Sequence, residues 1–321
     1  IFAKIAIMEY LTSGITSAFD MYIYPKEVIQ ACVDCGFRIV QVSGLNNFTS
    51  SLEELEEQYV TYNDYHELCS YKLGFHAEYT TDKKLLEGLA GLSEKYHAPV
   101  YTHNSETKRE VEECRQRYGK SPTQLFEEMG LYRYGGGGYH CIWFDDEDID
   151  IFAKRNLSVV TNPASNLKLA SGIAPLKKMQ EAGINLAIGT DGPASNNCLD
   201  MFREMFLVTG LAKLREHDAA VMDANDVLYM ATTGGAKAMG LSDCDCLAVG
   251  KKADLFLMDL MQPNMQPEHN LTKNLVYSGS KQNVKLTMVN GKILYEDGQF
   301  FISEEPQEIY KKANEIVSRM K

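Results

Sequence analysis

The sequence has no excess of basic residues. Its 32 Lys and Arg stand against 44 Asp and Glu, so the 321-residue chain has a net charge of -12 and a pI near 5.1. Nucleic-acid binding draws on clustered Lys and Arg that displace counterions from phosphates. The charge balance therefore argues against a nucleic-acid partner, and a small-molecule substrate is the default expectation.

The chain also lacks a long hydrophobic run. No stretch approaches the roughly 18 apolar residues of a membrane helix, and Lys4 and Glu9 interrupt the apolar pattern at the start. We therefore expect neither a membrane segment nor a secretion signal. The eight cysteines are scattered, which is typical of reduced thiols, so we expect a cytoplasmic protein without structural disulfides. Cys32 and Cys35 have the spacing of redox and zinc motifs, but they lie in a helical pattern, which favours a plain helix.

Short apolar runs rich in Val and Ile alternate with longer segments of helical period. This alternation is typical of parallel strands joined by crossover helices. Several helical segments begin at Pro or at a Ser or Asp cap and end at Gly, as helix ends commonly do. The predicted strands are 15–22, 37–44, 71–79, 98–106, 137–144, 157–163 and 185–191.

These β/α units favour a closed barrel over an open doubly wound sheet. No G-x-G-x-x-G motif follows any strand, and the glycine run 135–138 leads into an apolar strand, so we interpret it as close strand packing. A barrel of this type needs one strand more, and the chain begins on Ile1 rather than Met. We therefore predict an α/β fold, a distorted TIM (β/α)8 barrel whose first strand precedes residue 1.

The pattern changes near residue 245 to short runs separated by turns. Asn290-Gly291 and Asp297-Gly298 are signals for hairpin turns. Because this part is too short to be stable alone, we expect a segment before residue 1 to complete it. The predicted division is a barrel domain over 1–244, a small β-sandwich portion over 245–303 and a C-terminal helix over 304–321.

Side chains suited to acid–base or metal chemistry lie at the carboxyl ends of the predicted strands, where the active site of a β/α barrel lies. Each has a structural interpretation when taken alone, since a lone histidine is often a hydrogen-bonded structural residue and Asp before Gly-Pro is a common turn residue. Together, polar groups converging on one rim would be costly unless they served a metal or a substrate. The set is His76, His103, Glu106, His140 and Asp191.

Imidazole and carboxylate ligands suit zinc, iron or manganese, with a position left open for water. His103 and Asp191 alone would hold such an ion weakly. A catalytic site commonly supplies about three protein ligands. The remaining ligands must therefore come from elsewhere.

Five stretches carry a recognisable pattern: THNSET, YHCIWF, TNPASNLKLASGIAP, LAIGTDGPASNNCLDMFREM and VGKKADLFLMDL. The chain resembles the amidohydrolase superfamily from about residue 1 to 303, and most closely its branch of methylthioadenosine/S-adenosylhomocysteine deaminases and chlorohydrolase-like enzymes. The resemblance implies a distorted β/α barrel joined to a β-sandwich made from both chain ends. It also implies a metal-dependent aminohydrolase that releases ammonia from an adenosine-type nucleoside, namely methylthioadenosine, S-adenosylhomocysteine or adenosine.

The resemblance assigns a role to each site residue. It implies that His103 and Asp191 bind one divalent metal, usually zinc, together with a His-x-His pair upstream of residue 1. It implies that Glu106 holds and protonates the purine ring, His140 orients the attacking water and His76 contacts the substrate. Asp191 would also contact the substrate, accept the proton of the water and deliver it to the departing amine. A homo-oligomer is an expectation at the level of the family.

The sequence departs from the pattern of the family at three points. None of its seven histidines are two residues apart, so His-x-His is absent. Val42-Ser43-Gly44 stands where relatives that use S-adenosylhomocysteine have an arginine, which argues against recognition of a homocysteine carboxylate. Trp143 stands where many relatives have a second histidine.

Two alternatives to a nucleoside deaminase follow. The first is a related amidohydrolase or chlorohydrolase acting on another heterocycle, because this kind of site changes its leaving group readily. The second is a catalytically incompetent fragment that lacks the His-x-His ligands and holds no metal.

Overall fold

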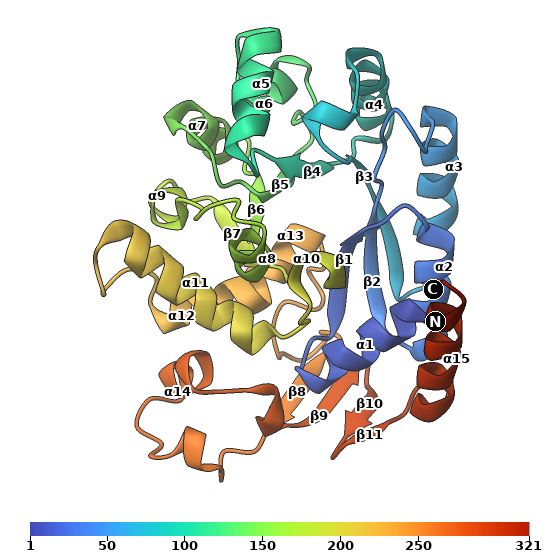
Figure 1. Cartoon of the computed structure of the whole chain (residues 1–321), viewed down its shortest axis with the longest axis vertical. Coiled ribbons are helices and arrows are strands. Elements are labelled where there is room, and N and C mark those ends of the chain that lie inside the picture. Colours follow the sequence, from blue (N-terminus) through green and yellow to red (C-terminus); the bar gives the residue numbers. More distant parts are fainter. Residues whose placement is uncertain (321) are drawn as a thin grey trace.

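The computed structural model describes residues 1–320 and contains two sheets (Figure 1). The larger sheet has seven strands in chain order, and each neighbouring pair is parallel. All seven predicted strands are present, each shorter than predicted because the last residues of the apolar runs already belong to loops. The strands are β1 (Ser17–Met21), β2 (Arg38–Val42), β3 (Cys69–Phe75), β4 (Val100–Asn104), β5 (Gly136–His140), β6 (Ser158–Thr161) and β7 (Asn185–Ile188).

Helices connect these strands and cover the outside of the sheet (Figure 1). Ser51 and Asp82 accept hydrogen bonds from backbone amides and cap two of them, in agreement with the predicted Ser and Asp caps, and Thr107 caps a third. The helices up to the end of the large sheet are α1 (Phe2–Thr12), α2 (Pro25–Cys35), α3 (Leu52–Asn63), η1 (Glu78–Thr80), α4 (Lys83–Tyr96), α5 (Lys108–Tyr118), α6 (Pro122–Glu128), α7 (Asp146–Lys154), α8 (Pro163–Lys168) and α9 (Leu176–Glu181).

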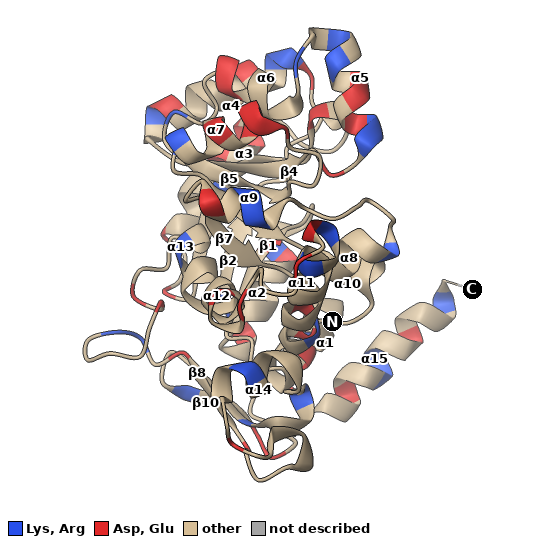
Figure 2. Ribbon diagram, turned by 90° about the vertical axis from the view of Figure 1, so that its left-hand side faces the viewer, with Lys and Arg blue, Asp and Glu red and all other residues tan. Residues whose placement is uncertain are grey.

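The remaining helices follow β7. They are α10 (Pro193–Asn196), α11 (Met201–Glu216), α12 (Ala224–Tyr229), η2 (Met230–Gly234), α13 (Gly235–Met239), η3 (Pro263–Met265), α14 (Leu271–Tyr277), η4 (Lys281–Asn283) and α15 (Pro306–Arg319). Figure 2 shows acidic and basic residues interspersed on the outer helices α4 to α7. Exposed ion pairs one helical turn apart, such as Lys83 with Glu87, contribute to this pattern.

The parallel sheet is curled like a barrel wall. Phe19 of β1 packs edge-on against Tyr101 of β4 and Tyr139 of β5, with ring centroids 4.9 and 5.6 Å apart. Strands that are not neighbours in the sheet can meet in this way only if the sheet bends round on itself. Within residues 1–320 the edge strands β1 and β7 each pair with one neighbour. The predicted α/β barrel-type fold is confirmed in the form of this curled, open sheet.

The glycine run at the start of β5 allows its close approach to both neighbouring strands. A Cβ atom on Gly136 would lie 1.9 Å from the carbonyl oxygen of Val100, and one on Gly137 would lie 2.3 Å from that of Ser158. Any larger residue would collide with the backbone there. The interpretation of this run as a packing device is confirmed.

The second sheet is antiparallel and lies beyond the barrel wall. Its order is β11-β10-β9-β8, and Asn290-Gly291 forms the turn between β9 and β10 with left-handed φ angles of 50° and 78°. Left-handed residues at both positions suit a tight hairpin. The four strands are β8 (Leu255–Met258), β9 (Val284–Val289), β10 (Lys292–Glu296) and β11 (Gln299–Phe300). The predicted β-sandwich portion is thus seen as one antiparallel sheet.

A buried ion pair joins the two sheets. Arg38 of β2 donates to both carboxylate oxygens of Asp254, at 2.7 and 3.0 Å, and both side chains are almost fully buried. Asp254 also accepts from the backbone amide of Asn290 at 2.6 Å. The ion pair therefore connects the barrel wall directly to the β9–β10 hairpin.

All eight cysteines are free thiols, and Cys32 and Cys35 are buried on α2, as their helical pattern predicted. No helix among residues 1–320 is both long enough and apolar enough to cross a bilayer.

Candidate functional site

The five predicted site residues come together at the carboxyl ends of β3, β4, β5 and β7. His76 follows β3 directly, His103 lies within β4, and His140 is the last residue of β5. Glu106 and Asp191 lie in the loops after β4 and β7, two and three residues beyond the strand ends. The prediction that Asp191 ends a strand was therefore wrong in detail, because the last pairing of β7 with β6 involves Ile188.

The three histidines form a row, and each uses Nδ1 in a hydrogen bond to the protein. His103 Nδ1 donates to the carbonyl oxygen of His76 at 2.8 Å, and His76 Nδ1 donates to the hydroxyl of Thr80 at 3.0 Å. His140 Nδ1 donates to Asn166 Oδ1 at 2.7 Å. The ring of His103 lies 5.0 Å from that of His76 and 5.6 Å from that of His140. The bond at Nδ1 leaves Nε2 of His103 with a free lone pair, whereas Asn162 Nδ2 lies 3.5 Å from Nε2 of His140.

The surroundings favour the neutral form of two of these imidazoles. Burial, together with the neighbouring His140 and His76, lowers the pKa of His103 to about 3. Burial also lowers the pKa of His76, against the opposing field of Glu106. At neutral pH both rings therefore present a lone pair and no charge.

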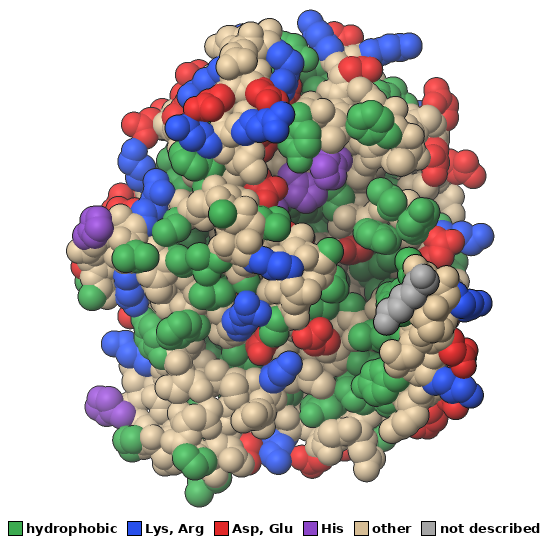
Figure 3. All heavy atoms as spheres, viewed as in Figure 1, with side chains coloured by type: hydrophobic (Ala, Val, Ile, Leu, Met, Phe, Trp, Pro, Cys, Tyr) green, Lys and Arg blue, Asp and Glu red, His purple; other side chains and the backbone are tan. Residues whose placement is uncertain are grey.

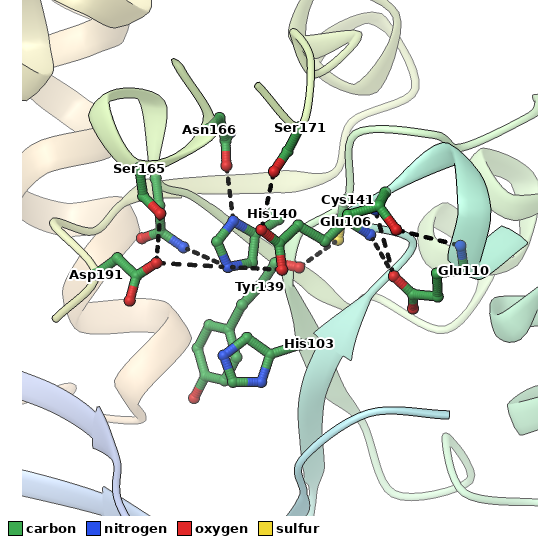
Figure 4. Close-up of polar contacts among 12 residues, drawn as sticks. His103, Glu106, Glu110, Tyr139, His140, Cys141, Ser165, Asn166, Ser171 and Asp191 are labelled. Carbon is green, nitrogen blue, oxygen red and sulfur yellow. Dashed lines mark hydrogen bonds and ion pairs between the residues drawn. The ribbon is translucent and has the colours of Figure 1, made fainter. Parts of the chain in front are cut away.

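Two carboxylates face the third histidine (Figure 4). His140 Nε2 lies 3.9 Å from Glu106 Oε2 and 4.0 Å from Asp191 Oδ2. These separations exceed a direct hydrogen bond, and they are short enough for one water molecule or substrate atom to bridge the groups from the side. His140 is buried, whereas both carboxylates remain partly open to solvent.

One short segment, 162–171, contacts all three of these groups, as Figure 4 shows. Ser165 Oγ donates to Asp191 Oδ2 at 2.5 Å, and Asn166 accepts from His140. Ser171 Oγ donates to Glu106 Oε1 at 3.0 Å. The sequence reasoning did not single out these polar residues, although they lie in the quoted TNPASNLKLASG stretch directly after β6. Their position directly after the end of β6 could have identified them as site residues.

A further carboxylate holds the loop that carries Glu106. Glu110 of α5 accepts from the backbone amides of Ser105 at 3.0 Å and Glu106 at 2.8 Å. Burial raises the pKa of Glu110 to about 7, although these hydrogen bonds act in the opposite direction. The backbone of this loop is thus held by the helix that follows it.

The backbone is strained at the same strand ends. Ser105, His140, Cys141 and Asp191 all have left-handed φ angles, between 50° and 68°. Non-glycine residues adopt this conformation at a cost, and such residues cluster at functional sites. The strain coincides with the converging polar groups.

The donor chemistry of two residues fits a divalent metal. A metal-binding histidine usually donates its other ring N–H to a carbonyl or carboxylate, and His103 Nδ1 does so to the carbonyl oxygen of His76. In Figure 4, Asp191 and Glu106 lie on either side of His140, with His103 below it. Among residues 1–320, no three His, Cys, Asp or Glu side chains form a complete metal-binding group. The expectation that His103 and Asp191 bind a metal therefore stays a prediction, and it needs further ligands.

Exposed apolar side chains surround the site. Figure 3 shows histidine side chains in a hollow with hydrophobic side chains beside it. The loops that follow five of the strands contribute Tyr22, Phe48, Tyr79, Trp143 and Leu167, each between 39% and 78% exposed. A separate surface cavity of about 390 Å³ lies between α6 and α7, is lined mainly by charged side chains and has no contact with this site.

The fold and the site define a class. A curled β/α sheet whose strand ends gather three imidazoles and two carboxylates is the arrangement of a β/α-barrel hydrolase. The chain belongs to the amidohydrolase family, whose pattern it matches over residues 1–294. The predicted family is confirmed, and with it the expectation of a hydrolase that acts on carbon–nitrogen bonds.

Two curated relatives cover nearly the whole chain. A 5-methylthioadenosine/S-adenosylhomocysteine deaminase from Thermoanaerobacter pseudethanolicus is 35% identical over 98% of this chain and 76% of the relative. A 5'-deoxyadenosine deaminase from Methanothermobacter thermautotrophicus is 36% identical over 94% of this chain and 72% of the relative.

Solved structures agree with the fold. An adenosine deaminase from Xanthomonas campestris with bound zinc has a TM-score of 0.93 and 32% identity, covering 99% of this chain and 74% of that one. An atrazine chlorohydrolase from Arthrobacter aurescens complexed with zinc has a TM-score of 0.89 at 22% identity, covering 98% of this chain and 76% of that one, and shows the fold alone.

Proposed function

We propose that the protein is a metal-dependent deaminase of adenosine-type nucleosides. The observation that supports this most is the convergence of Glu106 and Asp191 on His140, about which the attacking water and the ring could be placed. The names of the relatives agree with this chemistry. In the reaction, water replaces the exocyclic amine at C6 of the adenine ring, giving a C6 carbonyl and ammonia.

Each site residue has a proposed task. Asp191 accepts the proton of the attacking water and returns it to the leaving amine, while His140 Nε2 orients the water. Glu106 protonates the ring nitrogen beside C6, and Ser171 holds one of its oxygens at 3.0 Å. His76 contacts the substrate at the edge of the site. General acid–base steps of this kind contribute about 10²- to 10⁴-fold each to a rate.

The metal would be held by His103 and Asp191 together with further ligands. When bound, a zinc ion would lower the pKa of water towards about 7. Iron or manganese suits the same imidazole and carboxylate donors. Metal content of the purified protein, measured by elemental analysis, tests this assignment, and less than 0.1 equivalent of any divalent metal in an active preparation would contradict it.

The substrate proposed is one with an uncharged 5′ substituent, such as 5′-methylthioadenosine or 5′-deoxyadenosine. The rim consists of exposed apolar side chains, and the end of β2 carries Val42, Ser43 and Gly44 instead of a cation. The cation Lys168, on α8, is engaged with the carbonyl oxygen of Ala194 at 2.8 Å. A homocysteine carboxylate would therefore find no free positive partner among these residues.

A substrate panel tests the proposal. The metal-loaded protein is assayed for ammonia release with 5′-methylthioadenosine, 5′-deoxyadenosine, adenosine, S-adenosylhomocysteine and a chlorinated triazine. We expect kcat/KM for the uncharged nucleosides to exceed that for S-adenosylhomocysteine by about tenfold or more, the size of one charged hydrogen bond. Turnover of the triazine without turnover of any aminopurine would instead favour a chlorohydrolase.

A further inference from the structure

A buried carboxylate lies behind the site, on the helix that covers its outer side. Glu204 belongs to α11 and is fully buried. Its Oε2 accepts from the backbone amide of Ala164 at 3.0 Å, and its Oε1 accepts from Asn196 Nδ2 at 2.8 Å. The same Asn196 amide group donates to the carbonyl oxygen of Thr190 at 2.7 Å. Glu204 thus contacts two short helices at once, α8 at Ala164 and α10 at Asn196.

Each of these helices carries or adjoins residues of the site. Thr190 immediately precedes Asp191, so the contact through Asn196 fixes the backbone from which Asp191 projects. Ala164 is the second residue of α8, the helix that packs against α11 (Figure 1). The next two residues of α8 are Ser165 and Asn166, whose side chains contact Asp191 and His140.

The segment that starts at Ala164 also contacts Glu106, the third reacting group. The Ser171 backbone amide donates to the carbonyl oxygen of Asn166 at 2.9 Å, which folds the end of the segment back onto its start. From there Ser171 Oγ donates to Glu106. A displacement of α8 by a few tenths of an ångström would therefore move the partners of Glu106, His140 and Asp191 together.

We propose that Glu204 is a positioning residue for the reaction: it fixes α8 and the Asp191 loop so that all three groups keep their mutual geometry. This inference rests on the proposed deaminase function. Among residues 1–320 the hydrogen bonds of Glu204 go to Ala164 and Asn196, so it acts on the reacting groups through these two residues.

The chemistry of the contacts explains why a carboxylate is needed at this position. Both partners of Glu204 are N–H donors, so each of its two oxygens must accept. A glutamine would present an NH2 group to one of the donors and leave both groups unsatisfied in a buried place. Burial disfavours the charged carboxylate and raises the pKa of Glu204 to about 7, and the nearby Asp200 also raises it. The two hydrogen bonds and the nearby Arg203 lower the pKa.

The test compares Glu204→Gln with a matched control, Asp148→Asn. Asp148 is also a fully buried carboxylate with a raised pKa, and it accepts from the backbone amide of Asp145 at 3.0 Å. It is the third residue of α7, where it completes the capping box with Asp145, and it accepts from Ser121 at the start of α6, away from the strand ends. Urea unfolding of both variants shows whether each has kept its fold and how much stability it has lost.

We expect Glu204→Gln to lower kcat for 5′-methylthioadenosine by about 10- to 100-fold, the effect of one charged hydrogen bond, with KM within about twofold. Asp148→Asn should lose comparable stability and keep kcat. Asn196→Ala removes the connection from Glu204 to Thr190 and keeps the hydrogen bond from Ala164 to Glu204. This variant should also lower kcat, and it replaces Glu204→Gln in the test if Glu204→Gln proves too unstable to assay.

A second measurement does not depend on activity. Trp143 is the single tryptophan of the chain, and its Nε1 donates to the carbonyl oxygen of Ser171 at 2.8 Å, so its emission reports the position of the segment. Glu204→Gln should shift this emission, and Asp148→Asn should not. If Glu204→Gln loses stability but retains both kcat and the emission spectrum, the residue is merely structural and the proposal is overturned. If the wild-type protein deaminates no aminopurine, the proposed function fails, while the emission comparison still decides whether Glu204 positions the segment.

Discussion

Removal of the Ser165 hydroxyl should slow the proposed reaction without preventing folding. Ser165 is fully buried, and its Oγ donates to Asp191 Oδ2 at 2.5 Å. A hydrogen bond to a charged group contributes about 1.5–3 kcal/mol, and about 1.4 kcal/mol corresponds to a tenfold change in rate. We therefore expect Ser165→Ala to lower kcat/KM by roughly 10- to 150-fold, because Asp191 would no longer be held towards His140.

The assay is the initial rate of ammonia release from 5′-methylthioadenosine by the metal-loaded protein. Ser93→Ala is the matched control, since Ser93 is a buried serine of α4 whose hydroxyl donates to the carbonyl oxygen of Ala98 at 2.7 Å, outside the site. That control should change kcat/KM by less than about twofold. A folded Ser165→Ala protein with wild-type kcat/KM would refute the reasoning, because Asp191 would then not depend on this hydrogen bond.

Three further predictions concern the fold. Arg38→Met should lower the free energy of unfolding by about 3–5 kcal/mol because it leaves Asp254 buried and unpaired; the double variant with Asp254→Leu should recover part of the loss in urea titrations, and no recovery would contradict the pairing. Gly137→Ala should yield little folded protein by circular dichroism, because its Cβ would lie 2.3 Å from a carbonyl oxygen of β6. Burial raises the pKa of Asp148 from 3.8 to about 6, so native Asp148 keeps its proton while the unfolded chain releases it. The stability advantage of the wild type over Asp148→Asn should therefore fall by about 1–3 kcal/mol as pH rises from 4 to 6, and a pH-independent difference would contradict it.

The order of strands and the character of the fold could be predicted because each signal was local. Apolar runs, helix caps and the Asn290-Gly291 turn depend on neighbouring residues only, and each was found where the pattern indicated. The strand ends could not be predicted to the residue. The chain leaves the sheet where its neighbour stops pairing, as at Ile188, and that depends on contacts between distant segments.

In the candidate site, too, local signals could be predicted and contacts between distant segments could not. His76, His103 and His140 were identified from their position after apolar runs, because parallel strands present their carboxyl ends on one side. The hydrogen bonds that support these site residues join segments far apart in the sequence and could not be predicted in this way. Ser165 approaches Asp191 across 26 positions of sequence, and Glu204 approaches Ala164 across 40. Hydrogen bonds of this range depend on the packing of α8 between the strand ends and α11, which no local pattern records.

The most direct test of the proposed function is the rate of ammonia release from 5′-methylthioadenosine by the metal-loaded protein and by its Asp191→Asn variant, measured side by side. We predict that the wild type converts the nucleoside stoichiometrically to its C6-carbonyl product, and that the variant is slower by at least about 10²-fold, as expected for the loss of a general acid–base group. Absence of turnover by a wild-type protein that carries its metal, or an Asp191→Asn variant as fast as the wild type, would contradict the proposed function.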